Sequence, residues 1–371
     1  MLSAAKKRVL LLAAAFMLLP FAALAAPFNQ DDLKWLQTMA FAAHQTDYTG
    51  TFVYQYGNHV ETLRITHVAD RDGEHSRLEN LDGPRREIIR NNDQVTSYTG
   101  NHMILQERRP QNNREFPALL PQQLSLLDGN YVIKPLVEER IAGLNAHAFV
   151  FQPKDNLRYV HKMWAHDDTG LLLKTAVLDE RGGLIEQYAF TQLQVGGNID
   201  RNWISLGWTD SDRRAQDPHH HKHGSSFDNR QTGVIPQHDA AANDGHHDAD
   251  LNHKESVRAA HLLHKKGGRT LSSGWKVDGL PKGFQKIAEV RRLLPGKDAP
   301  VVQLVFSDGL AGISVFIEKS DDDEDDVSGL SSRGLIQVYT KLVNGNLVTV
   351  VGEVPPRTVI QVADSVRYSG R

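Results

Sequence analysis

The spacing of apolar residues changes from a helical period to a strand period near residue 48. Residues 29–47 begin with candidate N-caps at Asn29 and Asp31 and carry acidic residues in the first turn. The apolar residues of this stretch recur at helical spacing: Leu33, Leu36, Ala40 and Ala43. The stretch therefore predicts one amphipathic helix.

Alternating apolar and polar residues follow this helix. The runs 50–56 (GTFVYQY) and 60–68 (VETLRITHV) are separated by Gly57 and Asn58, a two-residue turn of the kind that closes hairpins. Further turn signals lie at 72–73, 82–84, 91–93, 168–170 and 181–183. This meander of antiparallel strands predicts a curved sheet or partial barrel, and the preceding helix is the candidate to cover one of its faces.

One segment interrupts the meander. Residues 116–130 (FPALLPQQLSLLDGN) contain Pro117, Pro121 and Gly129, and they predict a loop with a short helix. Strand-like runs then resume at 131–141, 145–153, 157–166, 171–179 and 184–195.

The composition changes after residue 208. Residues 209–273 are rich in Asp, His, Asn, Gly and Lys, which is typical of a flexible linker, with a short helix expected at 255–266. Because single cores seldom grow beyond about 250 to 300 residues, a chain of 371 residues is expected to hold two domains. We place the first at 26–208 and the second at 274–371.

The second domain reads as a small α+β module. Residues 301–319 predict two buried strands around the turn Ser307-Asp308-Gly309, and residues 334–354 predict a hairpin through Asn344-Gly345. A closing helix is expected at 357–366, and the acidic run 321–326 reads as a solvated loop. The fold class is thus α+β, mainly antiparallel β.

The first 25 residues have the pattern of a secretory signal peptide. Lys6, Lys7 and Arg8 precede an apolar run that is too short to span a bilayer, and an A-x-A site predicts cleavage between Ala25 and Ala26. The chain has no cysteine, which excludes disulfides, thiol catalysis and a lipid-modified N-terminal cysteine. Export without disulfides favours the periplasm of a Gram-negative bacterium.

Sequence patterns of known enzyme sites are absent: the chain has no G-x-S-x-G, H-E-x-x-H, P-loop or dinucleotide fingerprint. The prediction is a protein without enzymatic activity or cofactor, although scattered Asp, Glu and His residues could still meet in space. A net charge of -3 gives no general attraction to nucleic acid.

Histidines are concentrated in the linker. Ten of the 18 lie between His219 and His264, and four of them stand in residues 217–224, DPHHHKHG. Imidazoles can chelate zinc, copper or nickel, but a flexible tract offers no fixed second shell. The favoured interpretation is a polar linker, with weak metal buffering as the alternative, and no metal site is assigned.

Each of two further groups of residues can be explained either by a structural role or by a functional role. Phe52, Tyr54 and Tyr56 share one face of the first strand, and they either pack in the core or line an apolar cavity for acyl chains. Arg85 and Arg86 follow a Gly-Pro turn, where they either solubilise the turn or bind a carboxylate or phosphate of a partner.

Several longer stretches together resemble one family, the RseB/MucB periplasmic regulators of the envelope-stress sigma factor. They occur in both proposed domains and in the family's order: YTGTFVYQYGNHVETLRITH, RLENLDGPRREIIRNN, FPALLP, LLLKTAVLD, IEQYAFTQL, LPKGF, SDGLAGISVFIE and VTVVGEVPPRTVIQVADSV. The resemblance covers nearly all of the chain after the signal peptide. The segment from about 212 to 269, longer and richer in histidine than expected for the family, is the departure.

The resemblance implies both a fold and a function. The fold would be a LolA/LolB-like half-barrel covered by helices, followed by a small C-terminal domain. The function would be to bind the periplasmic region of a membrane anti-sigma factor of the RseA/MucA type and shield it from a DegS-type protease, until lipopolysaccharide or another lipid releases it. The residues expected to contact the partner are Arg85, Arg86, Glu87, Asp308, Val315 and Phe316.

Two questions stay open at the level of sequence. A periplasmic lipid or lipoprotein carrier is the alternative function, although a pure carrier would need only the first domain. Whether the chain also forms a homo-oligomer is not decided by any of these patterns.

Overall fold

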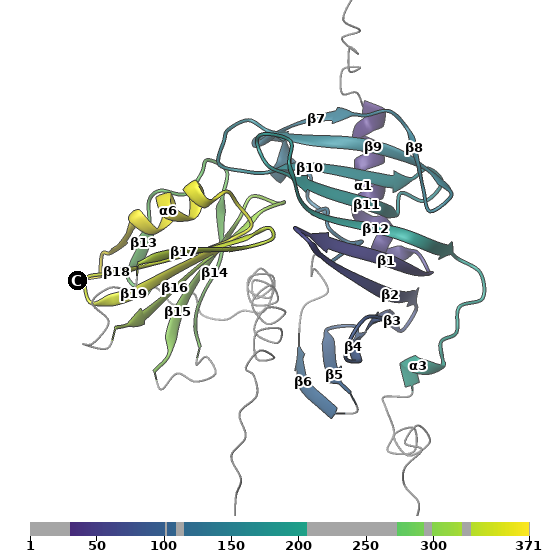
Figure 1. Cartoon of the computed structure of the whole chain (residues 1–371), viewed down its shortest axis with the longest axis horizontal. Coiled ribbons are helices and arrows are strands. Elements are labelled where there is room, and N and C mark those ends of the chain that lie inside the picture. Colours follow the sequence, from purple (N-terminus) through teal and green to yellow (C-terminus); the bar gives the residue numbers. More distant parts are fainter. Residues whose placement is uncertain are drawn as a thin grey trace, which may run out of the picture.

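The computed structural model describes residues 30–100, 102–108, 115–205, 273–292, 299–320 and 328–370. Figure 1 shows two sheet units, one N-terminal and strongly curved and one C-terminal and smaller, that meet along one side. In the N-terminal unit, twelve antiparallel strands follow the order β6-β5-β4-β3-β2-β1-β12-β11-β10-β9-β7, with β8 paired to β9.

The sheet is built from two runs of antiparallel strands, β1 to β6 and β7 to β12, which join where β1 pairs with β12. Their bounds are β1 Tyr48–Tyr56, β2 His59–Asp70, β3 Gly73–Asn80, β4 Arg86–Asn91, β5 Gln94–Thr99, β6 His102–Arg108, β7 Tyr131–Pro135, β8 Glu139–Ile141, β9 Leu144–Pro153, β10 Val160–His166, β11 Leu172–Leu178 and β12 Leu184–Val195. The predicted first hairpin is confirmed, since Tyr56 pairs with His59 across a two-residue turn in which Gly57 has φ 53°.

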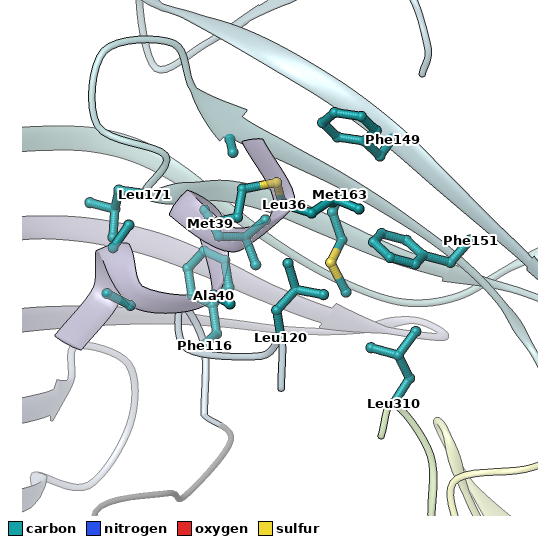
Figure 2. Packing of buried hydrophobic residues seen from close by; sticks show 14 of the residues in the cluster. Leu36, Met39, Ala40, Phe116, Leu120, Phe149, Phe151, Met163, Leu171 and Leu310 are labelled. Carbon is teal, nitrogen blue, oxygen red and sulfur yellow. The ribbon is translucent and has the colours of Figure 1, made fainter. Parts of the chain in front are cut away.

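Helix α1, Gln30–Gln45, confirms the predicted amphipathic helix, but Leu33 of the expected apolar face is 42% exposed. It lies against β2 and β11 and buries Leu36, Met39, Ala40 and Ala43 in the core of the N-terminal unit (Figures 1 and 2). Asp31 and Asp32 occupy its first turn, where acidic side chains complement the helix dipole, and His44 lies in its last turn. The predicted loop with a short helix is also present, as α2, Ser125–Asp128.

The C-terminal unit has a six-stranded antiparallel sheet in the order β14-β15-β16-β19-β18-β17. Its elements are β13 Trp275–Val277, β14 Gln285–Arg292, β15 Val301–Ser307, β16 Gly312–Lys319, β17 Gly329–Arg333, β18 Ile336–Val343, β19 Asn346–Gly352, α6 Pro356–Asp364 and β20 Val366–Tyr368. The two predicted hairpins and the closing helix are confirmed, whereas β13, β14, β17 and β20 are additions to the sequence prediction.

Helix α6 covers one face of this sheet (Figure 1). Val359 and Val362 are fully buried and pack in one cluster with Val315 and Val350 of the sheet. The fold class, α+β with mainly antiparallel strands in a large helix-covered sheet and a smaller second unit, is confirmed.

Several sequence predictions lie outside the described residues. These are the cleavage site at Ala25 and Ala26, nearly all of the linker at 209–273 with its histidines, and the acidic run 321–326. The domain boundaries therefore stay predictions. Within the described ranges, no helix combines the length and apolar character needed to cross a membrane.

Candidate functional site

The two sheet units meet at a junction formed by one end of the C-terminal sheet. The residues that contact the N-terminal unit include some from the β13–β14 loop, the β15–β16 turn, the β17–β18 turn and the start of α6. In Figure 1 these segments lie on the side of the C-terminal unit that faces β10 to β12. The junction is the candidate site, because it joins polar and apolar groups that are far apart in the sequence.

An ion pair buried between the units lies at the centre of the first contact. The Arg158 Nε–H donates to Asp308 Oδ2 at 2.5 Å, and the two side chains are 1% and 0% exposed. The hydroxyl of Tyr131 donates to the same oxygen at 3.1 Å. The second carboxylate oxygen accepts backbone N–H groups from Leu310 at 3.0 Å and Ala311 at 2.8 Å. Both oxygens of Asp308 are thus satisfied inside the protein.

Arg158 also donates to acceptors other than Asp308. It also pairs with Asp155 and donates through Nη2 to the carbonyl of Lys282 at 2.5 Å. Burial by itself would lower the pKa of Arg158, but the hydrogen bond and charge of Asp308 raise it above the ordinary value. Arg158 therefore keeps its positive charge, and separating the units would break its bonds to Asp308 and to the carbonyl of Lys282.

Leu310 carries the apolar part of the same contact. It extends from the C-terminal unit into the core of the N-terminal unit, where Figure 2 shows it near Leu120 and Phe151. The preceding Gly309 has φ 105°, and a Cβ at this position would lie 2.9 Å from Cδ2 of Leu127. Only glycine fits this turn at so close an approach.

A second contact joins the β17–β18 turn to β1. The guanidinium of Arg333 donates to the hydroxyl of Tyr56 at 2.9 Å and lies over its ring at 5.6 Å from the centroid. Next to it, Leu335 is buried in a cluster with Tyr159 and Val177.

The start of α6 makes the third contact. The hydroxyl of Thr358 donates to the carbonyl of Leu157 at 3.0 Å, and Arg357 pairs with Glu180 at 2.6 Å. A cavity of about 350 Å³ opens beside these residues and is lined from both units, including Tyr159 and Gln337. Burial raises the pKa of Tyr159 to about 12, so its hydroxyl stays neutral.

The predicted partner-contact residues fall in three different places. Asp308 lies at the junction, where it bonds within the chain, and Val315 lies in the core of the C-terminal unit with no exposed surface. Phe316 packs against the small cluster of Ile336 and Val351. The partner-contact role of all three stays a prediction.

The predicted group around the Gly-Pro turn is held together by charge. Glu87, 2% exposed, accepts from Arg77 Nε at 2.5 Å and lies 3.6 Å from Arg85 Nη2. Arg86 begins β4, on the same strand. Arg77, Arg85 and Glu87 form one charged cluster at β3 and β4, and the role of Arg85, Arg86 and Glu87 toward a partner is likewise a prediction.

The aromatic residues predicted on one face of β1 lie partly in the core and partly at the junction. They are Phe52, Tyr54 and Tyr56. Phe52 packs against Phe116 and Phe190 with ring centroids 5.0 and 5.7 Å apart. Tyr54 stacks on Tyr188 at 4.5 Å and donates to the buried Glu186 at 2.9 Å. Tyr56 meets Arg333 at the junction. An acyl chain would have to displace these packed rings, so the lipid-cavity role stays a prediction.

Metal ligation has no support in the described part of the chain. No group of three or more His, Asp or Glu side chains there has a geometry that could hold a metal ion.

Comparison with known proteins identifies the family. One family model, the MucB/RseB N-terminal domain, matches residues 31–206, and a second, the MucB/RseB C-terminal domain, matches residues 269–367. The chain belongs to the MucB/RseB family. The resemblance read from the sequence is thereby confirmed over both units.

Relatives match along about nine tenths of their length. The chain is 30% identical to the sigma factor AlgU regulatory protein MucB of Pseudomonas aeruginosa, over 93% of this chain and 94% of that protein. It is 25% identical to the sigma-E factor regulatory protein RseB of Salmonella typhimurium, over 90% and 89%. These MucB/RseB relatives are named as regulatory proteins.

Solved structures of MucB share the fold. The complex of Pseudomonas aeruginosa MucA and MucB matches with a TM-score of 0.64 at 26% identity, covering 92% of this chain and 100% of that chain. MucB in complex with MucA(peri) matches with a TM-score of 0.61 and the same identity, covering 91% and 99%.

Proposed function

We propose that this protein is a periplasmic negative regulator that binds the periplasmic region of a membrane anti-sigma factor of the RseA/MucA type. The observation that carries the proposal is the family match over both units, together with the MucB structures that contain MucA. The bound anti-sigma factor would be shielded from site-1 proteolysis by a DegS-type protease, and the sigma factor would stay inactive. The protein would act by binding alone, without catalysis or a cofactor.

The junction supports a regulator that works as one two-unit body. Leu310 of the C-terminal unit packs in the N-terminal core, and Asp308 pairs with Arg158 across the boundary. A partner segment that contacts both units would therefore meet a preformed surface, with little ordering cost.

Release by a lipid is the second part of the proposal. A lipid needs only to bind the free or rearranged protein better than the complex in order to shift the equilibrium. Lipopolysaccharide or another acyl lipid of the envelope is the proposed signal. A pure carrier function is disfavoured, because the C-terminal unit supplies a residue to the N-terminal core.

A pull-down followed by protease protection tests the function. The mature chain is mixed with the purified periplasmic segment of the anti-sigma factor from the same organism, and a DegS-type protease is then added. We expect stable capture and slower cleavage of the segment in proportion to the amount of regulator. Capture without protection would remove the shielding role, and absence of capture would remove the proposal.

Variants of the cluster on β3 and β4 refine this experiment. Replacing Arg85 and Arg86 by Glu reverses two charges next to Glu87. If these arginines contact the partner, affinity falls by at least tenfold, while an Arg140→Glu variant, altered on β8, keeps the original affinity. Unchanged binding by the double variant removes both arginines from the interface.

A further inference from the structure

A group of titratable side chains joins the end of α1 to the sheet. Glu74 of β3 accepts from two imidazoles: His44 Nδ1 lies 3.1 Å from Oε1, and His67 Nε2 lies 3.2 Å from the same oxygen. His44 stands in the last turn of α1 and His67 on β2. The shared carboxylate thus connects three elements of the N-terminal unit.

Both ring nitrogens of His67 face acceptors. Nδ1 lies 2.8 Å from the carbonyl oxygen of Thr46, and Nε2 faces the carboxylate of Glu74. A carbonyl and an ionised carboxylate only accept, and a neutral imidazole has one donor nitrogen. Both bonds can form together only when His67 is an imidazolium. The side chain is 2% exposed, so water does not substitute readily for a lost partner.

Both rings lie beside groups that attract cations. Tyr48 stacks on His67 with ring centroids 4.8 Å apart, and ring faces attract cations. His44 lies where the helix dipole is negative. Burial by itself would raise the pKa of Glu74, but hydrogen bonds from His44 and His67 lower it to about 2, so this group is a carboxylate at all ordinary pH values.

We propose that His44, His67 and Glu74 form a proton-dependent clamp, the histidine clamp, that holds the C-terminal end of α1 on β2 and β3. The inference is independent of the proposed function. The clamp is complete only while His67 carries protons on both ring nitrogens, and it is broken when one of these protons is lost at higher pH. An unprotonated nitrogen of His67 then faces a carboxylate oxygen or a carbonyl oxygen, and α1 loosens at this end.

The other charged groups around the clamp have partners of their own. Arg201 bridges Asp47 and Asp70, at 2.6 and 3.0 Å, and His75 Nε2 lies 4.0 Å from Asp70. Burial, with the charges of Glu74 and Glu115, raises the pKa of Tyr48 well above its ordinary value, which keeps that hydroxyl neutral. Arg90 pairs with Glu115 at 3.9 Å.

Hydrogen exchange on the mature chain tests the clamp. Protection factors of the amides from Ala42 to Thr46 are compared at pH 5.5 and 8.5. We expect about a tenfold loss at pH 8.5, which corresponds to one buried hydrogen bond. In Glu74→Gln and His44→Gln the difference between the two pH values should shrink to less than half of that, while His59→Gln, altered at the β1–β2 turn, should respond as the wild type does.

A measurement without substitutions guards against misfolded variants. The ¹⁵N shifts of the His67 ring in the native protein report directly whether both nitrogens carry protons. Two protonated nitrogens at pH 6 would support the clamp. A single neutral tautomer at pH 6, or wild-type protection that does not change with pH, would overturn it.

Discussion

Two ion pairs join the same two units and differ sharply in burial. Asp308 and Arg158 are 0% and 1% exposed, whereas Glu180 and Arg357 are 56% and 44% exposed. Their closest distances are almost equal, 2.5 and 2.6 Å. Distance therefore says little about what each pair contributes. The buried pair has no alternative partners in water, while the exposed pair exchanges its partner for water at little cost.

Removal of Asp308 should have the largest effect. Asp308→Ala leaves Arg158 buried beside Asp155 alone, and breaking a buried pair in this way costs about 3 to 5 kcal/mol of the free energy of unfolding. Urea denaturation measures the loss, and small-angle scattering should show a larger radius of gyration. Asp364→Ala, which breaks an exposed pair with Lys341, is the matched control and should cost under about 0.5 kcal/mol. Equal losses of stability in the two variants would show that burial does not decide what an ion pair contributes in this protein.

Loss of the Leu310 side chain should have the second-largest effect on stability. Leu310→Ala removes a side chain from the N-terminal core and should cost about 3 kcal/mol, since the surrounding residues close the cavity only in part. Leu330→Ala on β17, where the leucine is 45% exposed, should change the free energy of unfolding by less than about 0.5 kcal/mol. Thermal and urea unfolding check both. A small loss in Leu310→Ala would mean that the N-terminal core is complete by itself.

The carboxylate of Glu74 is partly buried, between the buried Asp308–Arg158 pair and the exposed Glu180–Arg357 pair. The pKa of Glu74 is about 2 in the folded protein and 4.5 ordinarily, so its stabilisation is present above pH 4.5 and is lost as the pH falls through 4.5 toward 2. The loss should amount to roughly 2 to 3 kcal/mol. Urea unfolding at pH 5.5 and 3.0 measures it. Glu74→Gln should lose less stability over this interval than the wild type, and an identical loss would exclude Glu74 as the source.

The exposed pair should give the smallest effect. Arg357→Ala should lower the free energy of unfolding by less than about 0.5 kcal/mol, because both partners already contact water. A double-mutant cycle with Glu180→Ala isolates the coupling between the two side chains. A coupling above about 1.5 kcal/mol would show that exposure is a poor guide at this junction.

The elements of the fold follow from local patterns, but the junction does not. Helical spacing at Leu36 and Ala40 and the turn at Gly57 are local signals, and both predictions are confirmed. Arg158 and Asp308 are 150 positions apart, and nothing near either residue announces the other. Leu310 reads as an ordinary apolar residue after a turn, so its insertion into a different core has no sequence signature.

The functional predictions show the same division. Family resemblance gave the regulator class from long matching stretches, because such stretches preserve a whole fold. It did not show that Asp308 bonds within the chain or that Val315 lies in a core, and the role of both residues toward a partner stays a prediction. A turn that presents a carboxylate looks alike in sequence whether it meets a partner protein or the neighbouring unit of its own chain.

The position of Leu310 also affects the order in which the two units can fold. The residues around it in the N-terminal core, such as Leu120 and Phe151, emerge first during synthesis, and Leu310 follows about 160 positions after Phe151. Closing so long a loop is slow compared with hairpin formation. Until then the N-terminal unit would present an open apolar patch, so newly synthesised chains should depend on chaperones or on rapid folding of the C-terminal unit.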